Sequence, residues 1–147
     1  MRLASLALVL MTAAANAQDA PRTLSTYLAE PEWAARFDRL FADMSKPDWL
    51  ARATEGEQVD VTLDGKPFSV LFACKQHDCG AHQMAVLFDN DTMYALQLET
   101  DYNSPHEALT WLNIGGGPES IDGKTILYAA MTGSLFNHPD MFDFPAE

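Results

Sequence analysis

Residues 59–88 have the sequence VDVTLDGKPFSVLFACKQHDCGAHQMAVLF and hold the strongest strand signals of the chain. Apolar and polar residues alternate on both sides of Asp64-Gly65, a dipeptide typical of a two-residue hairpin turn. The second arm runs directly into Cys74, and the apolar run 84–88 has the length of a further strand. The sequence therefore predicts a β-hairpin followed by a loop, residues 74–79, that joins two strands.

Downstream of this region, the pattern predicts more of the same sheet. Asp89-Asn90-Asp91 is a turn signal, and residues 92–99 are expected to form a fourth strand with Met93, Ala95 and Leu98 packing inward. The run 108–114 is ambiguous between strand and helix, and we favour a fifth strand that ends at Gly115. Strands in meander order indicate an antiparallel sheet.

Helices are predicted both before and after the strands along the chain. Pro31 suits a first helical position, and five apolar residues follow at helical spacing: Trp33, Phe37, Leu40, Phe41 and Met44. A short helical turn is expected over 47–51, with Gly56 ending the helical part.

In the C-terminal part, Asp122-Gly123 is predicted to be a turn, and residues 125–131 a helix stopped by Gly133. Phe142 and Phe144 in the tail are expected to dock on the core. The fold class predicted is α+β: one domain with an antiparallel sheet of about five strands and helices packed against it.

Charge and composition restrict the partners. The 147 residues include 21 acidic and 9 basic side chains, a formal net charge of −12, and 48% are hydrophobic, which is enough for a real core. Nucleic acid is an unfavourable partner because the few Lys and Arg residues are scattered. The favoured partner is small, neutral or basic.

The first 17 residues have the features of a cleavable signal peptide. Arg2 precedes a short apolar run, residues 3–11, and Ala15-Asn16-Ala17 places small residues at the expected cleavage site. The apolar run is too short to cross a bilayer, which needs about 20 residues, so we expect an exported domain, residues 18–147, that is not anchored in a membrane. Removing the segment takes away one basic residue and leaves a charge of −13.

Export permits a disulfide, and Cys74 and Cys79 are the only cysteines. A bridge over so short a ring contributes roughly 2 kcal/mol in the chain-entropy model, so its expected purpose is local: it holds Lys75, Gln76, His77 and Asp78 in one conformation. The alternative is a tight turn whose side chains are solvated and bind no partner.

The sequence offers weaker support for metal binding, redox chemistry and hydrolysis. Cys74, His77, Cys79 and His82 have the pattern C-x2-H-x-C-x2-H, but the spacing is too compact for a structural zinc site. Disulfide oxidoreductases use C-x-x-C, and no hydrolase signature such as G-x-S-x-G or H-E-x-x-H occurs. We expect no catalytic residue, no metal and no cofactor.

Four blocks of the chain resemble the family called inhibitor of vertebrate lysozyme (Ivy), a group of periplasmic proteins of Gram-negative bacteria. The blocks stand in family order and span roughly the last half of the chain: Cys74–Cys79 with Gly80, LTWLN at 109–113, SIDGKT at 120–125, and TGSL at 132–135 followed by NHPD at 137–140.

The resemblance implies a binding function without chemistry. In that family the disulfide-closed loop enters the active-site cleft of a C-type lysozyme and places its histidine, His77 here, between the two catalytic carboxylates. Lys75, Gln76, His77 and Asp78 are then the lysozyme-binding residues, with Cys74 and Cys79 as the bridge. The family's loop is typically Cys-Lys-Pro-His-Asp-Cys, and Gln76 stands where the proline would be, so this loop is predicted to be looser.

The resemblance also implies a periplasmic homodimer. A rival from a different functional class remains open: a periplasmic housekeeping factor that restrains the cell's own murein-cleaving enzymes or binds peptidoglycan fragments. The two readings differ in which partner is bound tightly.

Overall fold

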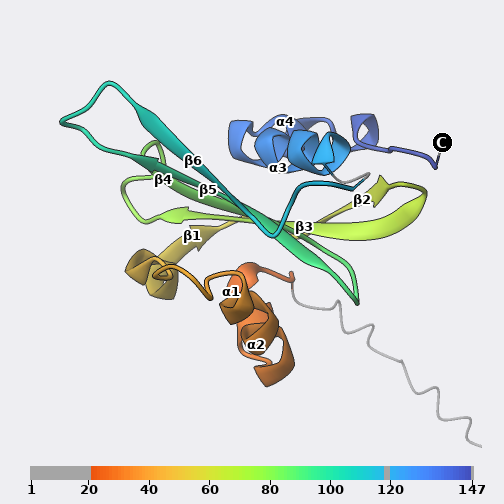
Figure 1. Ribbon diagram of the computed structural model, residues 1–147, viewed down its shortest axis with the longest axis horizontal. Coiled ribbons are helices and arrows are strands. Elements are labelled where there is room, and N and C mark those ends of the chain that lie inside the picture. Colours follow the sequence, from red (N-terminus) through yellow and green to blue (C-terminus); the bar gives the residue numbers. More distant parts are fainter. Residues whose placement is uncertain (1–20, 118–119, 147) are drawn as a thin grey trace, which may run out of the picture.

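A computed structural model describes residues 21–117 and 120–146 as an antiparallel sheet with helices on both faces (Figure 1). The predicted signal peptide, residues 1–17, lies outside the described residues. The predicted fold class, α+β in one domain, is confirmed. The strands are β1 (Ala53–Glu55), β2 (Val59–Leu63), β3 (Lys66–Lys75), β4 (His82–Phe88), β5 (Met93–Thr100) and β6 (Glu107–Leu112).

The sheet order is β1-β3-β4-β5-β6, and β2 also pairs with β3. The long strand β3 holds both short strands on one edge: β2 pairs with its first half, Val59 opposite Val70, and β1 with its end, Ala53 opposite Lys75. The predicted hairpin over β2 and β3 and the predicted strands 84–88, 92–99 and 108–114 are confirmed within a few residues.

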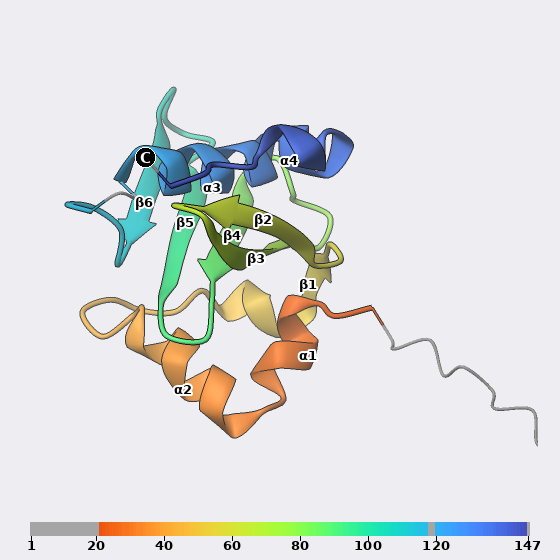
Figure 2. The same cartoon turned by 90° about the vertical axis from the view of Figure 1, so that its right-hand side faces the viewer.

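Two helical layers enclose the sheet (Figure 2). On one face lie α1 (Leu24–Leu28), α2 (Pro31–Arg39) and the 3-10 turn η1 (Asp48–Arg52); on the other lie α3 (Asp122–Thr132), α4 (Ser134–Asn137) and the turn η3 (Pro139–Met141). Phe37 anchors the first layer against Leu71 and Met84, while Ile126 and Leu127 anchor the second against the opposite face. Because both faces are covered, five consecutive residues of β4, Met84–Phe88, are buried.

The C-terminal tail docks as predicted. Phe142 and Phe144 pack against the core on the α3 side, and the Phe144 amide donates to the Thr62 carbonyl at 3.0 Å. Gly133 ends α3 with a φ of 78°, the left-handed conformation that made it a helix stop.

Several local expectations were wrong. The apolar spacing predicted a helix that reaches Met44, but α2 ends at Arg39. Beyond it the chain forms tighter turns, in which the Leu40 amide donates to the Phe37 carbonyl and the Phe41 amide to the Asp38 carbonyl. Phe41 is buried, but Met44 is exposed.

The other differences concern short elements. The helical part ends at Arg52 rather than Gly56, because residues 53–55 pair with the end of β3 as β1. Asp122-Gly123 is not a turn: both residues belong to the first turn of α3, where the Asp122 carboxylate suits the helix dipole. The five-residue helix α1 was not predicted at all.

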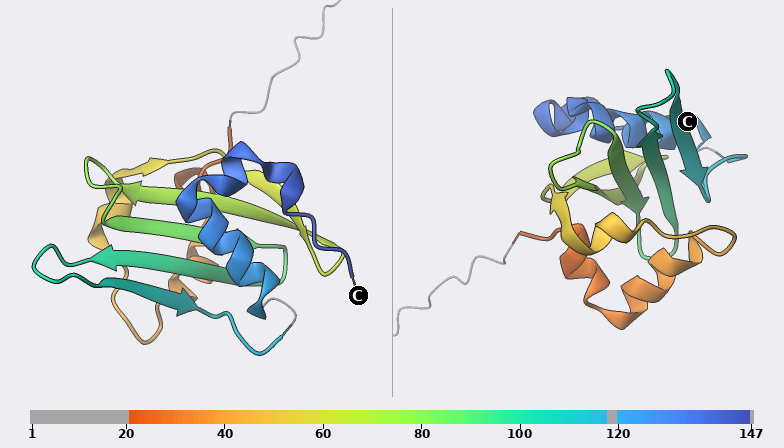
Figure 3. Two further views of the ribbon diagram at one scale, coloured as in Figure 1. Left: turned by 90° about the horizontal axis from the view of Figure 1, so that it is seen from above. Right: turned by 90° about the vertical axis from the view of Figure 1, so that its left-hand side faces the viewer.

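Within the described ranges, no helix has the length and apolar character needed to cross a bilayer. Two loops share one end of the sheet. The loop between β3 and β4 and the loop between β5 and β6 both project from the same end, whereas the β2–β3 and β4–β5 turns lie at the other (Figure 3).

Candidate binding site at the disulfide-closed loop

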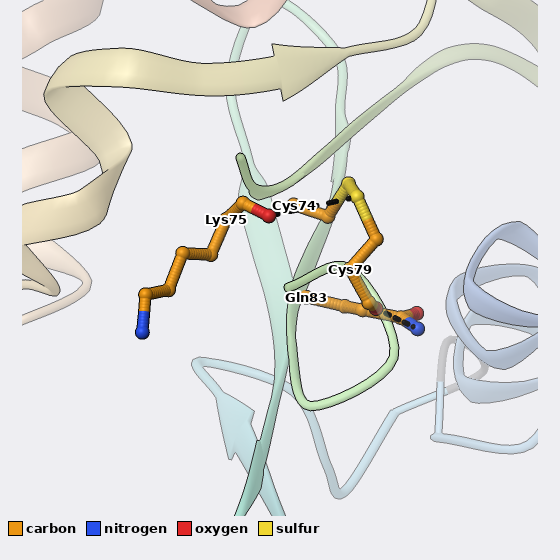
Figure 4. The surroundings of a disulfide bond; sticks show 4 residues. All are labelled: Cys74, Lys75, Cys79 and Gln83. Carbon is orange, nitrogen blue, oxygen red and sulfur yellow. Dashed lines mark hydrogen bonds between the residues drawn. A yellow bond between two sulfur atoms is a disulfide. The ribbon is translucent and has the colours of Figure 1, made fainter. Parts of the chain in front are cut away.

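The loop between β3 and β4 is closed by the predicted disulfide. Cys74 and Cys79 are bonded to each other with their Cα atoms 4.8 Å apart (Figure 4). Cys74 lies opposite Gln83 in the β3–β4 register, and the Gln83 side-chain amide donates to the Cys79 carbonyl at 2.7 Å. The Cys79 sulfur also lies 3.6 Å from the Lys75 carbonyl oxygen. The ring is therefore fastened to the first residues of β4.

Within the ring, residues 75–78 form a β-turn. The Asp78 amide donates to the Lys75 carbonyl at 2.9 Å, which makes Gln76 and His77 the two central residues. His77 has a φ of 65°, the left-handed region that non-glycine residues seldom adopt. Both central side chains are exposed, so the turn presents His77 at its tip.

The Asp78 carboxylate ties the turn to its surroundings. One oxygen, Oδ2, lies 3.1 Å from Lys75 Nζ and 3.2 Å from His82 Nε2. The other oxygen, Oδ1, accepts a hydrogen bond from the Tyr102 hydroxyl. The bond from Tyr102, followed by the bond from Lys75, lowers the pKa of Asp78 below its ordinary value of 3.8.

Behind Asp78, a chain of polar contacts continues across the strands. His82 Nδ1 contacts the Glu99 carboxylate, so each ring nitrogen faces a different carboxylate. Glu99 in turn accepts hydrogen bonds from the Trp49 indole at 3.4 Å and from the Gln97 side chain at 2.9 Å. The loop is thereby linked through β4 and β5 to η1.

Tyr102 reaches Asp78 from the β5–β6 loop. Asp101 shapes that loop: its Oδ1 accepts from the Asn103 amide at 2.8 Å, and its carbonyl accepts from the Ser104 amide at 2.9 Å. The hydrogen bond to Asp78 raises the pKa of the Tyr102 phenol above its ordinary value of 10.0, because ionisation would remove the proton that this bond requires. The Tyr102 residue is nevertheless 75% exposed.

The four residues predicted for the site differ in what they offer a partner. Gln76 and His77 point into solvent, whereas Lys75 and Asp78 are paired with each other. Sequence reasoning missed Tyr102, Glu99 and the supporting role of His82. No local motif marks Tyr102, because its contact with Asp78 spans 24 residues and exists only once two loops meet.

The site is a projection rather than a cavity. A cavity of about 630 Å³ lies at the other end of the sheet, between α2 and the ends of β5 and β6, where Arg39, Met93 and Asn113 line it. The zinc alternative loses both cysteines to the disulfide, and no group of three or more His, Cys, Asp or Glu in residues 21–117 and 120–146 is arranged to hold a metal ion.

Comparison with known proteins places this loop in a family. A family model described as inhibitor of vertebrate lysozyme (Ivy) matches residues 32–132. The chain belongs to the Ivy family. The Ivy match spans the sheet, the disulfide-closed loop and Tyr102, so the whole site described above lies inside it.

Individual relatives agree with this assignment. The proteins named inhibitor of vertebrate lysozyme from Escherichia coli K12 and from Escherichia coli O157:H7 are each 38% identical over 141 residues, which covers 94% of this chain and 88% of theirs. The protein of the same name from Pseudomonas aeruginosa is 34% identical over 105 residues, 66% of this chain and 68% of that one.

Proposed function

We propose that this protein inhibits C-type lysozyme and that the loop Cys74–Cys79 is the part that enters the enzyme's active-site cleft. Membership of the Ivy family and the names of the relatives support a lysozyme partner. The observation that carries the site assignment is the exposed His77 at the tip of a turn that is closed by a disulfide. A projecting, constrained loop is suited to fill a cleft.

The inhibitory step is occupation rather than chemistry. A retaining glycosidase holds its two catalytic carboxylates about 5–5.5 Å apart, and an imidazole has one nitrogen on each of two edges. A protonated His77 placed between them donates one charge-assisted hydrogen bond to each carboxylate. A neutral His77 donates from one nitrogen to the ionised carboxylate and accepts with the other from the protonated catalytic acid. The acid then has no access to the leaving group and the nucleophile has none to the sugar. On this account the protein acts as an inhibitor and not as an enzyme.

Preorganisation explains why so small a loop can bind strongly. A flexible loop loses conformational entropy when it is ordered in a complex, whereas a constrained one has already lost it. The disulfide, the Lys75–Asp78 turn and the contacts of Asp78 with Lys75 and His82 all hold the loop before any partner arrives.

We place this activity in the periplasm. The predicted signal peptide and the disulfide, a bond that persists in oxidising compartments, support export. The homodimer is likewise a proposal: β6 ends the sheet order, so within the described residues its outer edge has no strand partner and can accept one from a second copy. Light scattering on the mature chain, residues 18–147, measures the mass and tests the dimer.

A lysis assay with the mature oxidised chain tests the function. We expect stoichiometric inhibition of a C-type lysozyme, a weakening of about 100-fold or more in His77→Ala, and a partial loss in a Cys74→Ser/Cys79→Ser double variant that removes only the constraint. His138→Ala is the matched control, because that exposed histidine precedes Pro139, which lies near Pro67 at the opposite end of β3.

The assay also separates the rival function. No inhibition by the unsubstituted chain at micromolar excess and low salt would contradict the proposal and favour the housekeeping role with the cell's own murein-cleaving enzymes. Inhibition that survives in His77→Ala would contradict the assigned loop while leaving the partner in place.

A further inference from the structure

The loop between β5 and β6 lies at the same end of the sheet as the disulfide-closed loop (Figure 3). Its residue Tyr102 is joined to Asp78, the residue that follows His77, by a hydrogen bond from the tyrosine hydroxyl to Oδ1. Since Lys75 and His82 both approach Oδ2, Tyr102 holds the oxygen that neither of them contacts. Asp78 is therefore fixed from the ring itself, from β4 and from the second loop.

Tyr102 also has an open face. It is 75% exposed although its hydroxyl is engaged, so the ring is presented to solvent beside the turn that carries His77. The bonds from Asn103 and Ser104 to Asp101 keep the backbone around it in a defined turn. Tyrosine is enriched among the residues that dominate binding energy in interfaces, because it buries a large rigid area at low entropic cost.

We propose that the β5–β6 loop is the second part of the lysozyme-binding surface, in which Tyr102 positions the His77 turn through Asp78 and contacts the enzyme with its exposed ring. This inference rests on the proposed lysozyme-inhibitor function. It makes the binding surface a pair of loops joined by one hydrogen bond instead of a single ring.

Two substitutions separate the two roles of Tyr102. Tyr102→Phe removes only the hydroxyl, and we expect inhibition to weaken about 3- to 10-fold, the usual effect of one lost hydrogen bond whose partner stays accessible to solvent. Tyr102→Ala also removes the ring, and we expect a weakening of about 30-fold or more. Tyr128→Phe and Tyr128→Ala are the controls, because Tyr128 is a half-exposed tyrosine on α3, and both should inhibit as the unsubstituted chain does.

A readout on the free protein tests the positioning role without lysozyme. The side-chain carboxyl carbon of Asp78, followed by NMR, should titrate at a higher pH in Tyr102→Phe than in the unsubstituted chain, and should not change in Tyr128→Phe. In addition, Asp78→Asn combined with Tyr102→Phe should weaken inhibition by less than the product of the two single effects, because both changes remove the same bond.

The possible results distinguish a failure of this inference from a failure of the proposed function. If His77→Ala abolishes inhibition while both Tyr102 variants inhibit within twofold of the unsubstituted chain, the second loop is not part of the surface and the proposed function stands. If Tyr102→Phe leaves both inhibition and the Asp78 titration unchanged, the positioning role is wrong. If the unsubstituted chain does not inhibit, the proposed function fails, and this inference fails with it.

Discussion

His77 occupies the third position of a four-residue turn with a left-handed backbone, a conformation that costs a non-glycine residue roughly 1–2 kcal/mol. Glycine would fit this position without strain, but glycine carries no imidazole. The disulfide between Cys74 and Cys79 and the Asp78–Lys75 backbone bond supply the constraint that keeps His77 in this state. The closed ring thus allows a histidine side chain at a position where the backbone would otherwise favour glycine.

Gln76 precedes His77 at the second position of the same turn, where proline is favoured because its ring fixes φ near −65°. Lys75, the residue before it, is the last residue of β3 and therefore has the extended backbone that proline requires of its neighbour. We expect Gln76→Pro to stabilise the fold by about 0.4–1 kcal/mol, measured by urea denaturation, and to strengthen lysozyme inhibition.

Gln76→Ala controls for loss of the glutamine side chain and should show neither gain. A Gln76→Pro variant that is less stable than the parent would mean that the turn has a different backbone at this position, and that the looser loop inferred from the missing proline is a wrong reading of the sequence.

At the scale of elements, two loops from separate hairpins are held together by Asp78 and Tyr102. The pKa of Asp78 is lowered by this contact, so the stabilisation is fully present above about pH 4 and is lost as pH falls through the folded value. The pKa of Tyr102 is raised, so its part is present below about pH 10 and is lost as pH rises above it. The loops are joined throughout the range between these limits.

This pH window can be measured on the free protein. We expect the Asp78 carboxyl carbon to titrate with a midpoint below 3.8, and the Tyr102 ring carbons to report ionisation only above pH 10.0. A midpoint for Asp78 at or above 3.8 would show that its carboxylate is free in solution, and the two loops would then move independently.

The sequence predicted those elements that carry a strong period. The turn signal Asp64-Gly65 and the apolar run Met84–Phe88 predicted strands of the sheet, and Gly133 predicted the end of α3. Each of these signals lies within a few neighbouring residues. The strand β1 was not predicted, because three residues are too few to show an alternation of apolar and polar side chains. Its pairing with the end of β3 is a contact between distant parts of the sequence. The closed ring was predicted from the spacing of the two cysteines, and the role of His77 from the resemblance to the Ivy family. Tyr102 could not be predicted, because its contact with Asp78 exists only in the three-dimensional arrangement.

At the scale of the whole molecule, the formal charge of −12 bears on association. C-type lysozymes of vertebrates are basic, so long-range attraction should accelerate the encounter and depend on salt, whose screening length falls from about 30 Å at 0.01 M to about 8 Å at 0.15 M. Stopped-flow measurements should show an association rate that falls steeply over this range while the dissociation rate changes little. An association rate that does not change with salt would contradict the claim that the negative charge of this protein accelerates its encounter with lysozyme.

The measurement that tests the central claim most directly is competition at the enzyme's cleft. A soluble oligosaccharide fragment of murein is titrated into the lysozyme complex of the mature oxidised chain, and the apparent dissociation constant of the protein is followed by calorimetry. Because the His77 loop and the sugar are assigned to the same site, the apparent constant should rise linearly with the concentration of free sugar and should keep rising as the sugar approaches full occupancy of the cleft. An affinity that stays constant at saturating oligosaccharide would place the protein elsewhere on lysozyme and contradict the proposal that the His77 loop blocks the catalytic carboxylates.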